Sequence, residues 1–410
     1  MIIDIVKTNF KIIIFGFVFT FFSSIGQSFF IGLFNSNIRA ELNITHGEFG
    51  TIYGAATLCS SITLIWLGKK IDDLKLVNYS FVVVFFLSFA SLFFSFIHGI
   101  LLLVIGIFFL RLSGQGLMAH TASVAISRYF DKSRGKALSY AWVGMSLGEF
   151  LLPLIIVYLL TFIYWRDLWQ VFALIVILIL PIFTYLTIKE VSKFSREEKI
   201  IDNIEKKNLL IKSWTRQEVL KDLKFYSILP AMLASSFIIT GIVINQTFII
   251  ESKDWDQFAI AKSFMIYSIL TVGTLFFSGF LVDKFTSRKL FPLLNFPLML
   301  SLFVLIFFDH PYSAYVFMGL MGVSNGLTNV LMTSFWAEIY GVNYLGSIKA
   351  LTGSLMVFST ALATAVFGVL IDLGYAIEKI AIFCAIYTVL SIVIVLIFKK
   401  NYKPVLENRT

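Results

Sequence analysis

Charged residues are scarce in this sequence. Asp, Glu, Lys and Arg together make up 14% of the 410 residues, whereas soluble globular domains carry about 25%. Hydrophobic residues make up 58% of the chain, and its mean hydropathy is +0.89. This shortage of charge excludes a chain that faces water along most of its length, so we expect a protein that lies largely in lipid.

Residues that usually carry catalysis or bind metals are also few. The two cysteines, Cys59 and Cys384, both fall within apolar stretches, and the four histidines are scattered along the chain. The sequence contains no G-x-x-x-x-G-K-[ST], H-E-x-x-H or C-x-x-C motif, the patterns of ATP binding, zinc proteases and redox or metal centres. We therefore predict no enzyme, no metal and no cofactor.

Long apolar runs, in contrast, are abundant. Each is about 18 residues or longer, the length that a helix needs to cross a ~30 Å hydrocarbon core. The alternating segments of a β-barrel do not stand out. The first run is too long for a signal peptide, so we interpret it as an uncleaved span. The sequence predicts an all-α membrane protein with twelve spans, near residues 10–34, 47–68, 76–97, 99–125, 136–161, 167–188, 223–250, 258–282, 289–308, 312–336, 346–371 and 376–398.

Lys and Arg are unequally divided between the two sides of these spans. Twenty-seven lie in the terminal segments and in the loops on the same side, whereas four lie in the opposite loops, with Lys262 at the start of a span. Cytoplasmic loops carry the excess of Lys and Arg, so we predict that both termini are cytoplasmic. The same asymmetry accounts for the net charge of +9 without a nucleic acid as partner.

The two halves of the chain share landmarks. Gly68 and Asp72 follow the second span, Gly279 and Asp283 follow the eighth, and both pairs form G-x-x-x-D at an offset of 211 residues. Transporters built from two parallel repeats hold their substrate between the repeats. We infer three parts: a six-helix bundle, a cytoplasmic linker, and a second bundle with a short tail, over residues 1–188, 189–222 and 223–410.

These landmarks resemble motifs of the major facilitator superfamily, and the resemblance covers nearly the whole chain. Gly68-Lys-Lys-Ile-Asp72 is similar to the family's loop motif, and Gly279-Phe-Leu-Val-Asp283-Lys-Phe-Thr-Ser-Arg288 is a better-formed second copy. The first copy departs from the pattern at Asp73, where the family usually has a basic residue. The resemblance implies a monomeric transporter of the bacterial inner membrane, with two pseudo-symmetric six-helix bundles that work by alternating access.

Four further stretches carry the resemblance. Arg111-Leu-Ser-Gly114-Gln-Gly116 is similar to the fourth-span arginine–glycine motif, and Gly144-x-x-x-Gly148 is similar to the fifth-span motif. Glu149 departs from that motif, because proline usually follows the glycine. The stretches GQSFFIGLF and IRAELNITHGEFGTIY resemble a bacterial subgroup near the monocarboxylate and oxalate–formate carriers.

The resemblance also implies that the loop motifs gate the transporter. Asp72 would meet the start of the eleventh span near Gly346, and Asp283 the start of the fifth near Gly135, because a helix N-terminus favours an anion. A tight solvated turn that only marks topology is the alternative. The candidate gating residues are Gly68, Asp72, Gly279, Asp283 and Arg288.

Arg111 and Glu149 lie about half-way along neighbouring spans. A cation at that depth costs about 3 kcal/mol or more and usually faces a water-filled cavity. One interpretation is that Arg111 binds an anionic group of the substrate, with Gln115 on the same helix face, and that Glu149 is a proton site. The alternative is a fixed Arg111–Glu149 ion pair that locks two helices together.

Other polar and aromatic side chains lie within the spans. In the family that the chain resembles, spans one, four, seven and ten line the central cavity. A single amide in a span is also commonly an interhelical hydrogen bond, and a single aromatic residue commonly faces lipid or core. Further candidates for substrate binding or coupling are Gln27, Asn245, Gln246, Asn325, Tyr53, Trp142 and Tyr267.

Taken together, the sequence predicts a secondary transporter of a small organic solute. We favour an organic anion, such as a monocarboxylate, because of Arg111, with the proton as coupling ion in symport or antiport. Efflux of drugs or metabolites is the alternative within the same superfamily, and a membrane sensor without transport is the alternative from another class.

Overall fold

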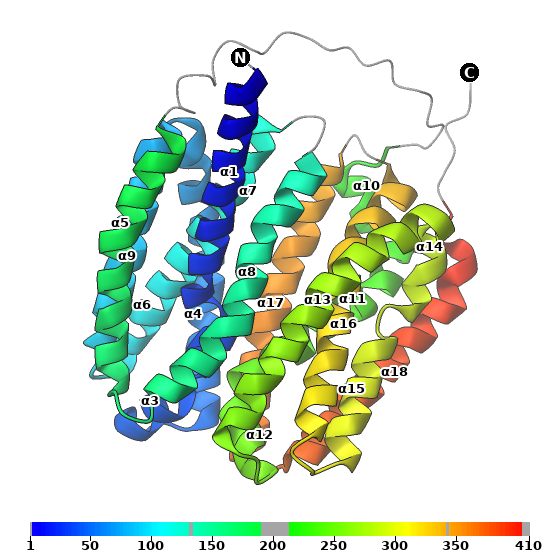
Figure 1. Cartoon of the computed structure of the whole chain (residues 1–410). Coiled ribbons are helices and arrows are strands. Elements are labelled where there is room, and N and C mark those ends of the chain that lie inside the picture. The colour runs from blue at the N-terminus through cyan, green and yellow to red at the C-terminus, as the bar shows by residue number, and fades with distance from the viewer. Residues whose placement is uncertain (1, 131–133, 190–212, 342–343, 404–410) are drawn as a thin grey trace. The chain divides into compact units, whose positions relative to one another are not determined.

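The computed structural model describes residues 2–130, 134–189, 213–341 and 344–403, and every regular element in these ranges is a helix (Figure 1). Within them, twelve helices are long and apolar enough to cross a membrane, one for each predicted apolar run. The chain divides into two compact units, Met1–Asp202 and Asn203–Thr410. The protein is therefore an all-α, multi-pass integral membrane protein.

Six spans form the first unit, and the short helix α3 (Asn35–Leu42) lies between the first two. The spans are α1 (Ile2–Ser23) with η1 (Ser24–Gly26) and α2 (Ser28–Gly32); α4 (His46–Lys69); α5 (Leu76–Ser95); α6 (Ile100–Leu110) with the π-helix η3 (Arg111–Met118) and α7 (Ala119–Tyr129); α8 (Arg134–Leu159); and α9 (Trp165–Ile188).

Six more spans form the second unit, after α10 (Arg216–Lys221), which begins with a capping box between Thr215 and Glu218. The spans are α11 (Leu223–Ile244) with α12 (Gln246–Ser252); α13 (Gln257–Phe285); α14 (Ser287–Leu290) with η5 (Phe291–Leu293) and α15 (Phe296–Phe307); α16 (Ser313–Tyr340); α17 (Leu345–Asp372); and α18 (Ile377–Phe398) with η6 (Lys399–Asn401).

The first and seventh spans are interrupted, although the sequence predicts them as continuous runs. The first unwinds where Gln27 adopts an extended backbone (φ −84°, ψ 157°), next to Gly26, a residue that weakens a helix. The seventh breaks at Asn245, whose φ of −102° and ψ of 26° are not helical. Hydropathy does not report such breaks, because the residues on both sides remain apolar.

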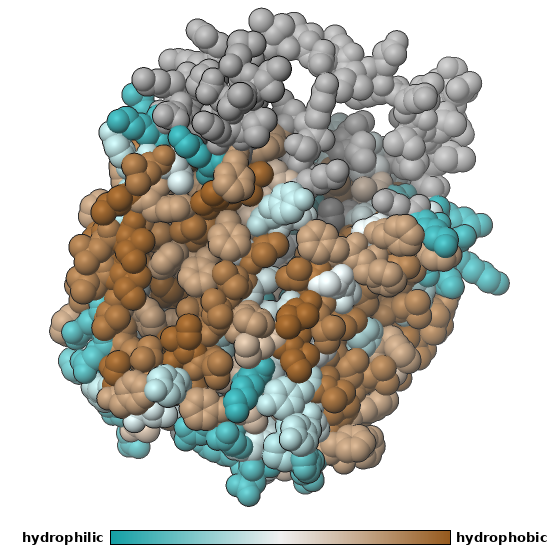
Figure 2. Space-filling view, viewed as in Figure 1, coloured by the Kyte–Doolittle hydropathy of each residue, from teal (hydrophilic) through white to brown (hydrophobic). Residues whose placement is uncertain are grey.

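Large apolar side chains cover the outside of the helices. Trp66, Leu101 and Ile397 are 67%, 73% and 70% exposed, and Figure 2 shows hydrophobic residues along the sides of the helices and hydrophilic ones near their ends. In water such a surface would be unstable, since each buried Å² of apolar area is worth about 25 cal/mol. In a bilayer the same side chains contact lipid.

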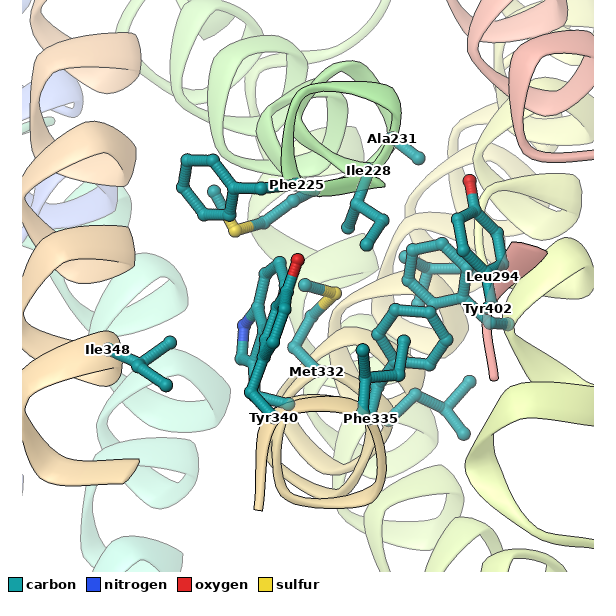
Figure 3. Close-up of a cluster of buried hydrophobic side chains, with 14 of the residues drawn as sticks. Phe225, Ile228, Ala231, Leu294, Met332, Phe335, Tyr340, Ile348 and Tyr402 are labelled. Carbon is teal, nitrogen blue, oxygen red and sulfur yellow. The ribbon is translucent and has the colours of Figure 1, made fainter. Parts of the chain in front are cut away.

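Aromatic side chains fill one end of the second unit (Figure 3). The rings of Phe291 and Phe335 stack with centroids 3.9 Å apart, and Trp336 stacks on Tyr340 at 5.8 Å. The Tyr340 hydroxyl donates to Asp222 Oδ2 at 3.2 Å. Helix η5 and the start of α11 are thereby fixed against α16 at this end.

An ion pair between a buried arginine and an exposed glutamate closes the first unit at one end. Arg166, at the start of α9, donates through Nη2 to Glu41 Oε1 at 2.5 Å and through Nη1 to the Ser95 carbonyl at 2.8 Å. Trp165 Nε1 also donates to Glu41, at 2.8 Å, and so does the Tyr164 hydroxyl. Burial alone would raise the pKa of the Glu41 carboxyl, but these hydrogen bonds outweigh burial and hold its pKa below the ordinary value.

The second unit contains a matching ion pair with the charges exchanged. Lys253, whose side chain is fully buried, lies 2.7 Å from Glu378 Oε1 and 2.5 Å from Asp309 Oδ1. Burial would lower the pKa of the Lys253 ammonium, but both carboxylates outweigh it and raise that pKa. Glu41 and Arg166 are 125 residues apart, as are Lys253 and Glu378. Each unit therefore joins the loop after its first span to its sixth span in the same way.

Candidate functional site

The break in the first span lies against the π-helix of the fourth span. A Cβ atom added to Gly26 would lie 2.3 Å from the Leu110 carbonyl oxygen and 2.5 Å from the Gln115 nitrogen, and one added to Gly114 would lie 2.6 Å from the Gly26 nitrogen. Only glycine permits two backbones to approach this closely. The glycines of RLSGQG thus make the contact, and π-helical turns are frequent at functional sites.

This contact places the Arg111 side chain beneath the interruption of the first span. Arg111 Nη1 donates to the Gly26 carbonyl at 3.1 Å and to Ser28 Oγ at 3.4 Å. The guanidinium carbon lies 5.2 Å from the centre of the Tyr53 ring, and the Tyr53 hydroxyl donates to Ser28 Oγ at 2.9 Å. The structure therefore brings together two predicted site residues, Arg111 and Tyr53, and adds Ser28, which the sequence analysis missed.

The charge of Arg111 is not neutralised by a carboxylate. The side chain is 2% exposed, and none of its ion-pair or hydrogen-bond partners in the described ranges is acidic. Its Nε has no hydrogen-bond partner. A cation–π contact contributes about 0.5–2 kcal/mol, which offsets only part of the cost of a buried cation. N–H groups of the planar guanidinium therefore remain available to donate to an anion. A carboxylate fits this planar pair of donors best.

Glu149 follows Gly148 on α8, and the glycine face of this helix packs beside the same interruption. A Cβ atom on Gly144 would lie 2.0 Å from the Phe17 carbonyl oxygen, and one on Gly148 would lie 2.1 Å from Ser24 Oγ. The G-x-x-x-G face of α8 therefore packs against α1, as expected for this spacing, and α8 remains one helix through Pro153. Among the described residues Glu149 makes no hydrogen bond or ion pair, so the Arg111–Glu149 lock is not formed in this structure.

The remaining candidates in the first unit have no such contacts. Gln27 is half-buried at the interruption itself, and Gln115 is half-buried on the π-helix. Neither side chain hydrogen-bonds to Arg111. Trp142 is 39% exposed on the surface of α8. The structure leaves the roles of these three side chains as predictions.

In the second unit the structure brings together Tyr267 and Asn325. Asn325 Nδ2 donates to the Tyr267 hydroxyl at 2.9 Å, from α16 to α13. Asn245 Nδ2 donates instead to the Gly241 carbonyl of its own helix at 2.9 Å, and Gln246 is buried at the start of α12. Asn245 is thus satisfied within its helix, whereas Asn325 links two spans.

The predicted gating residues are described only in part. The side chains of Asp72 and Asp283, and the surroundings of Gly135 and Gly346, lie outside the described residues. A Cβ on Gly68 would lie 3.2 Å from His120 Nε2, whereas a Cβ on Gly279 would meet no atom of another described segment within 4 Å. Close packing thus applies to the first motif and not to the second.

The second loop motif has a partner that the sequence analysis did not assign. Glu338 Oε1 accepts from the Ser287 N–H at 2.8 Å and Oε2 from the Arg288 N–H at 3.2 Å, and Arg288 Nε lies 3.4 Å from Glu338 Oε2. This carboxylate caps the start of α14, where unpaired N–H groups favour an anion. The fold holds Arg288 against α16.

Solved structures of transporters share this architecture. The nucleoside transporter NupG superposes with a TM-score of 0.71 at 12% identity over 97% of this chain and 99% of its own, and a mutant of NupG gives 0.70 at 13% over 95% and 99%. A bacterial homologue of the human lysosomal transporter Spinster gives 0.64 at 14%, over 96% of each chain. At these identities the likeness establishes the fold. No curated protein sequence matches the chain.

The described ranges thus form a membrane protein of twelve spans with a charged residue buried among them. The sequence profile of the Major Facilitator Superfamily matches residues 16–364. The chain belongs to this family, and it is a transporter of a small solute and not an enzyme.

Proposed function

We propose that the protein transports a small organic anion, of the monocarboxylate type, and that Arg111 binds its anionic group. The observation that carries this proposal is the burial of Arg111 at 2% exposure without an acidic partner among the described residues. A carboxylate would supply the missing charge and accept two parallel hydrogen bonds from the guanidinium. Tyr53 and Ser28 hold the guanidinium in place before the substrate arrives.

Proton coupling runs through Glu149. This carboxyl lies next to the glycine face that packs on the interruption of α1, and it has no cation beside it in the described ranges. A carboxyl in such a place is far cheaper to carry through a transport cycle with its proton than without it. Proton binding at Glu149 and anion binding at Arg111 therefore both act near one short, non-helical segment.

The loop motifs gate the cytoplasmic side, and both termini lie in the cytoplasm of a bacterial cell. The distribution of 27 basic residues on one side and four on the other supports this orientation. Asp72 and Asp283 act as the gating anions of the two loop motifs, as the resemblance implies. A shift of cysteine accessibility in an Asp283→Asn variant towards the inward-open state tests this gate, and no shift would identify a plain turn.

The substrate class is tested by exchange in proteoliposomes. Purified protein is loaded with one monocarboxylate, and the uptake of labelled monocarboxylates, their neutral amides, nucleosides and lipophilic drugs is measured. We expect the wild-type protein to exchange the carboxylates and not the amides. Arg111→Gln should abolish exchange, and Arg111→Lys should reduce it at least about tenfold because lysine lacks the planar fork.

The control is Arg39→Gln, which removes an arginine that hydrogen-bonds to Asn35 on α3 at 2.8 Å. This variant should exchange at the wild-type rate. Exchange of neutral drugs or nucleosides that is indifferent to Arg111 would instead favour the efflux or neutral-solute alternative.

A further inference from the structure

Basic side chains from two distant segments gather at the end of the second unit that the aromatic side chains of Figure 3 fill. They form a lysine cluster of four residues: Lys289 of α14, Lys399 and Lys400 of η6, and Lys403 just after η6. All four are exposed, and none makes an ion pair within the described residues. The second unit therefore presents four exposed cations at this end.

A buried tyrosine holds the two segments of the lysine cluster together. The ring centre of Tyr402, which is 2% exposed, lies 6.1 Å from that of Phe291, and its hydroxyl lies 3.1 Å from Ser227 Oγ. Lys289 comes two residues before Phe291, and Lys400 comes two residues before Tyr402. Because lysine carries its charge on a flexible four-carbon stem, side chains from both segments can reach the same ligand.

Large apolar side chains lie directly beside the lysine cluster. Leu293 is 58% exposed and comes four residues after Lys289, and Ile397 is 70% exposed and comes two residues before Lys399. Figure 2 shows hydrophilic residues at its right-hand edge, where Figure 1 places α14 and the end of α18, next to hydrophobic ones. The surface thus joins a group of cations to the apolar sides of helices that face lipid.

The loop motif of the first unit carries a different charge pattern. There Lys70 lies 3.5 Å from Asp73 Oδ2, so an exposed cation has an anion beside it. The preference of basic residues for one side of a membrane accounts for lysines at both of these places. It does not require unpaired lysines of two distant segments to meet over a fixed aromatic contact, so the lysine cluster calls for a ligand of its own.

We propose that the lysine cluster binds the headgroup of an anionic phospholipid. The ammonium groups contact the phosphate, and the acyl chains lie along Leu293 and Ile397. Basic segments next to a membrane-spanning helix attract anionic lipids in this way. A soluble anion would fit the charge but would gain nothing from the exposed apolar side chains. The surface is separate from Arg111, so this inference does not depend on the solute that is transported.

Native mass spectrometry of the full-length protein in detergent tests this surface. Phosphatidylglycerol is the anionic probe, and phosphatidylcholine with the same acyl chains is the neutral one. We expect the first phosphatidylglycerol to bind at least about tenfold more tightly than the first phosphatidylcholine, because only the former carries a net charge. The variant Lys289→Gln/Lys400→Gln/Lys403→Gln should lower the affinity for phosphatidylglycerol at least about tenfold and leave the affinity for phosphatidylcholine unchanged.

Two control variants separate a local site from the overall charge of the protein. Lys75→Gln/Lys221→Gln/Lys349→Gln removes three exposed lysines that lie in three separate parts of the chain, and it should bind phosphatidylglycerol as tightly as the wild-type protein. Replacing the same three residues of the lysine cluster by arginine keeps their charge and should keep the affinity as well.

Three outcomes would overturn the inference. The first is a glutamine variant of the lysine cluster that binds phosphatidylglycerol like the wild-type protein, and the second is an equal loss in this variant and in the dispersed control. The third concerns the unfolding temperature of the wild-type protein, which phosphatidylglycerol should raise and inorganic phosphate at the same concentration should not. An equal rise with both would identify a site for soluble anions in place of a lipid surface.

Discussion

The guanidinium carbon of Arg111 lies 5.2 Å from the centre of the Tyr53 ring, and both residues are buried. The negative face of the ring offsets part of the positive charge, but it does not accept hydrogen bonds from the N–H groups along the edge of the guanidinium. A carboxylate would do both. The contact therefore holds the arginine ready for an anion without competing for the position that the anion would occupy.

The Tyr53 ring should matter more for transport than its hydroxyl. Tyr53→Phe keeps the cation–π contact and loses only the bond to Ser28 at 2.9 Å, so we expect a less than about threefold rise in KM for the anion. Tyr53→Leu loses the ring, and a loss of about 1–2 kcal/mol corresponds to a rise of about 5- to 30-fold. Uptake kinetics in proteoliposomes measure both values, and equal KM values for the two variants would reject the contact as a substrate-site feature.

Gly26 should not tolerate a side chain. Gly26→Ala brings a methyl group within 2.3 Å of the Leu110 carbonyl oxygen, and overpacking of this kind costs about 1–3 kcal/mol. We expect a lower unfolding temperature in detergent together with slower exchange. The matched control is Gly273→Ala in α13, where an added Cβ would meet no atom of another described segment within 4 Å. This variant should unfold at or above the wild-type temperature. Similar behaviour of the two variants would contradict the close contact.

The number and type of the spans could be predicted from the sequence, because helix length and hydropathy report directly on a bilayer. Interruptions of the spans could not be predicted in this way. The backbone at Gln27 and Asn245 departs from the helix without a change in hydropathy, and the π-helix at Arg111–Met118 depends on packing against Gly26.

The candidate site could be predicted in part. A charged residue in the middle of a span is rare, so Arg111 could be identified from the sequence. Its closeness to Tyr53 depends on contacts between spans, which a single sequence does not report. Ser28 carried no signal beyond its place next to Gln27. The ion pairs of Arg166 and Lys253 have their charges exchanged between the two units. A comparison of residue types therefore does not detect this repeat, and the equal spacing of the paired residues does.

Replacing Glu149 by glutamine should separate coupling from binding. Glu149→Gln keeps the shape of the side chain and removes its titration, so we expect exchange at near the wild-type rate but no accumulation driven by an inward proton gradient. The measurement is uptake into proteoliposomes with and without a pH difference of about two units. Accumulation that still follows the gradient in Glu149→Gln would exclude this residue as the proton site.

Acid should weaken the ion pair between Glu41 and Arg166. The pKa of Glu41 is lower in the folded protein than the unfolded value of about 4.3, so its contribution is present above that pH and is lost as the pH falls through the folded pKa. The wild-type protein should unfold at a higher temperature than Glu41→Gln by a constant margin above about pH 5. That margin should shrink below about pH 4, and a margin independent of pH would contradict the lowered pKa.

The most direct test of the account is equilibrium binding of an organic anion to purified protein with and without the Arg111 fork. Isothermal titration with the monocarboxylate that exchanges fastest should give a Kd for the wild-type protein, and Arg111→Gln should weaken it about tenfold to a hundredfold, the range expected for a charged hydrogen bond of about 1.5–3 kcal/mol. A folded Arg111→Gln variant that binds the anion as tightly as the wild-type protein would contradict the central claim.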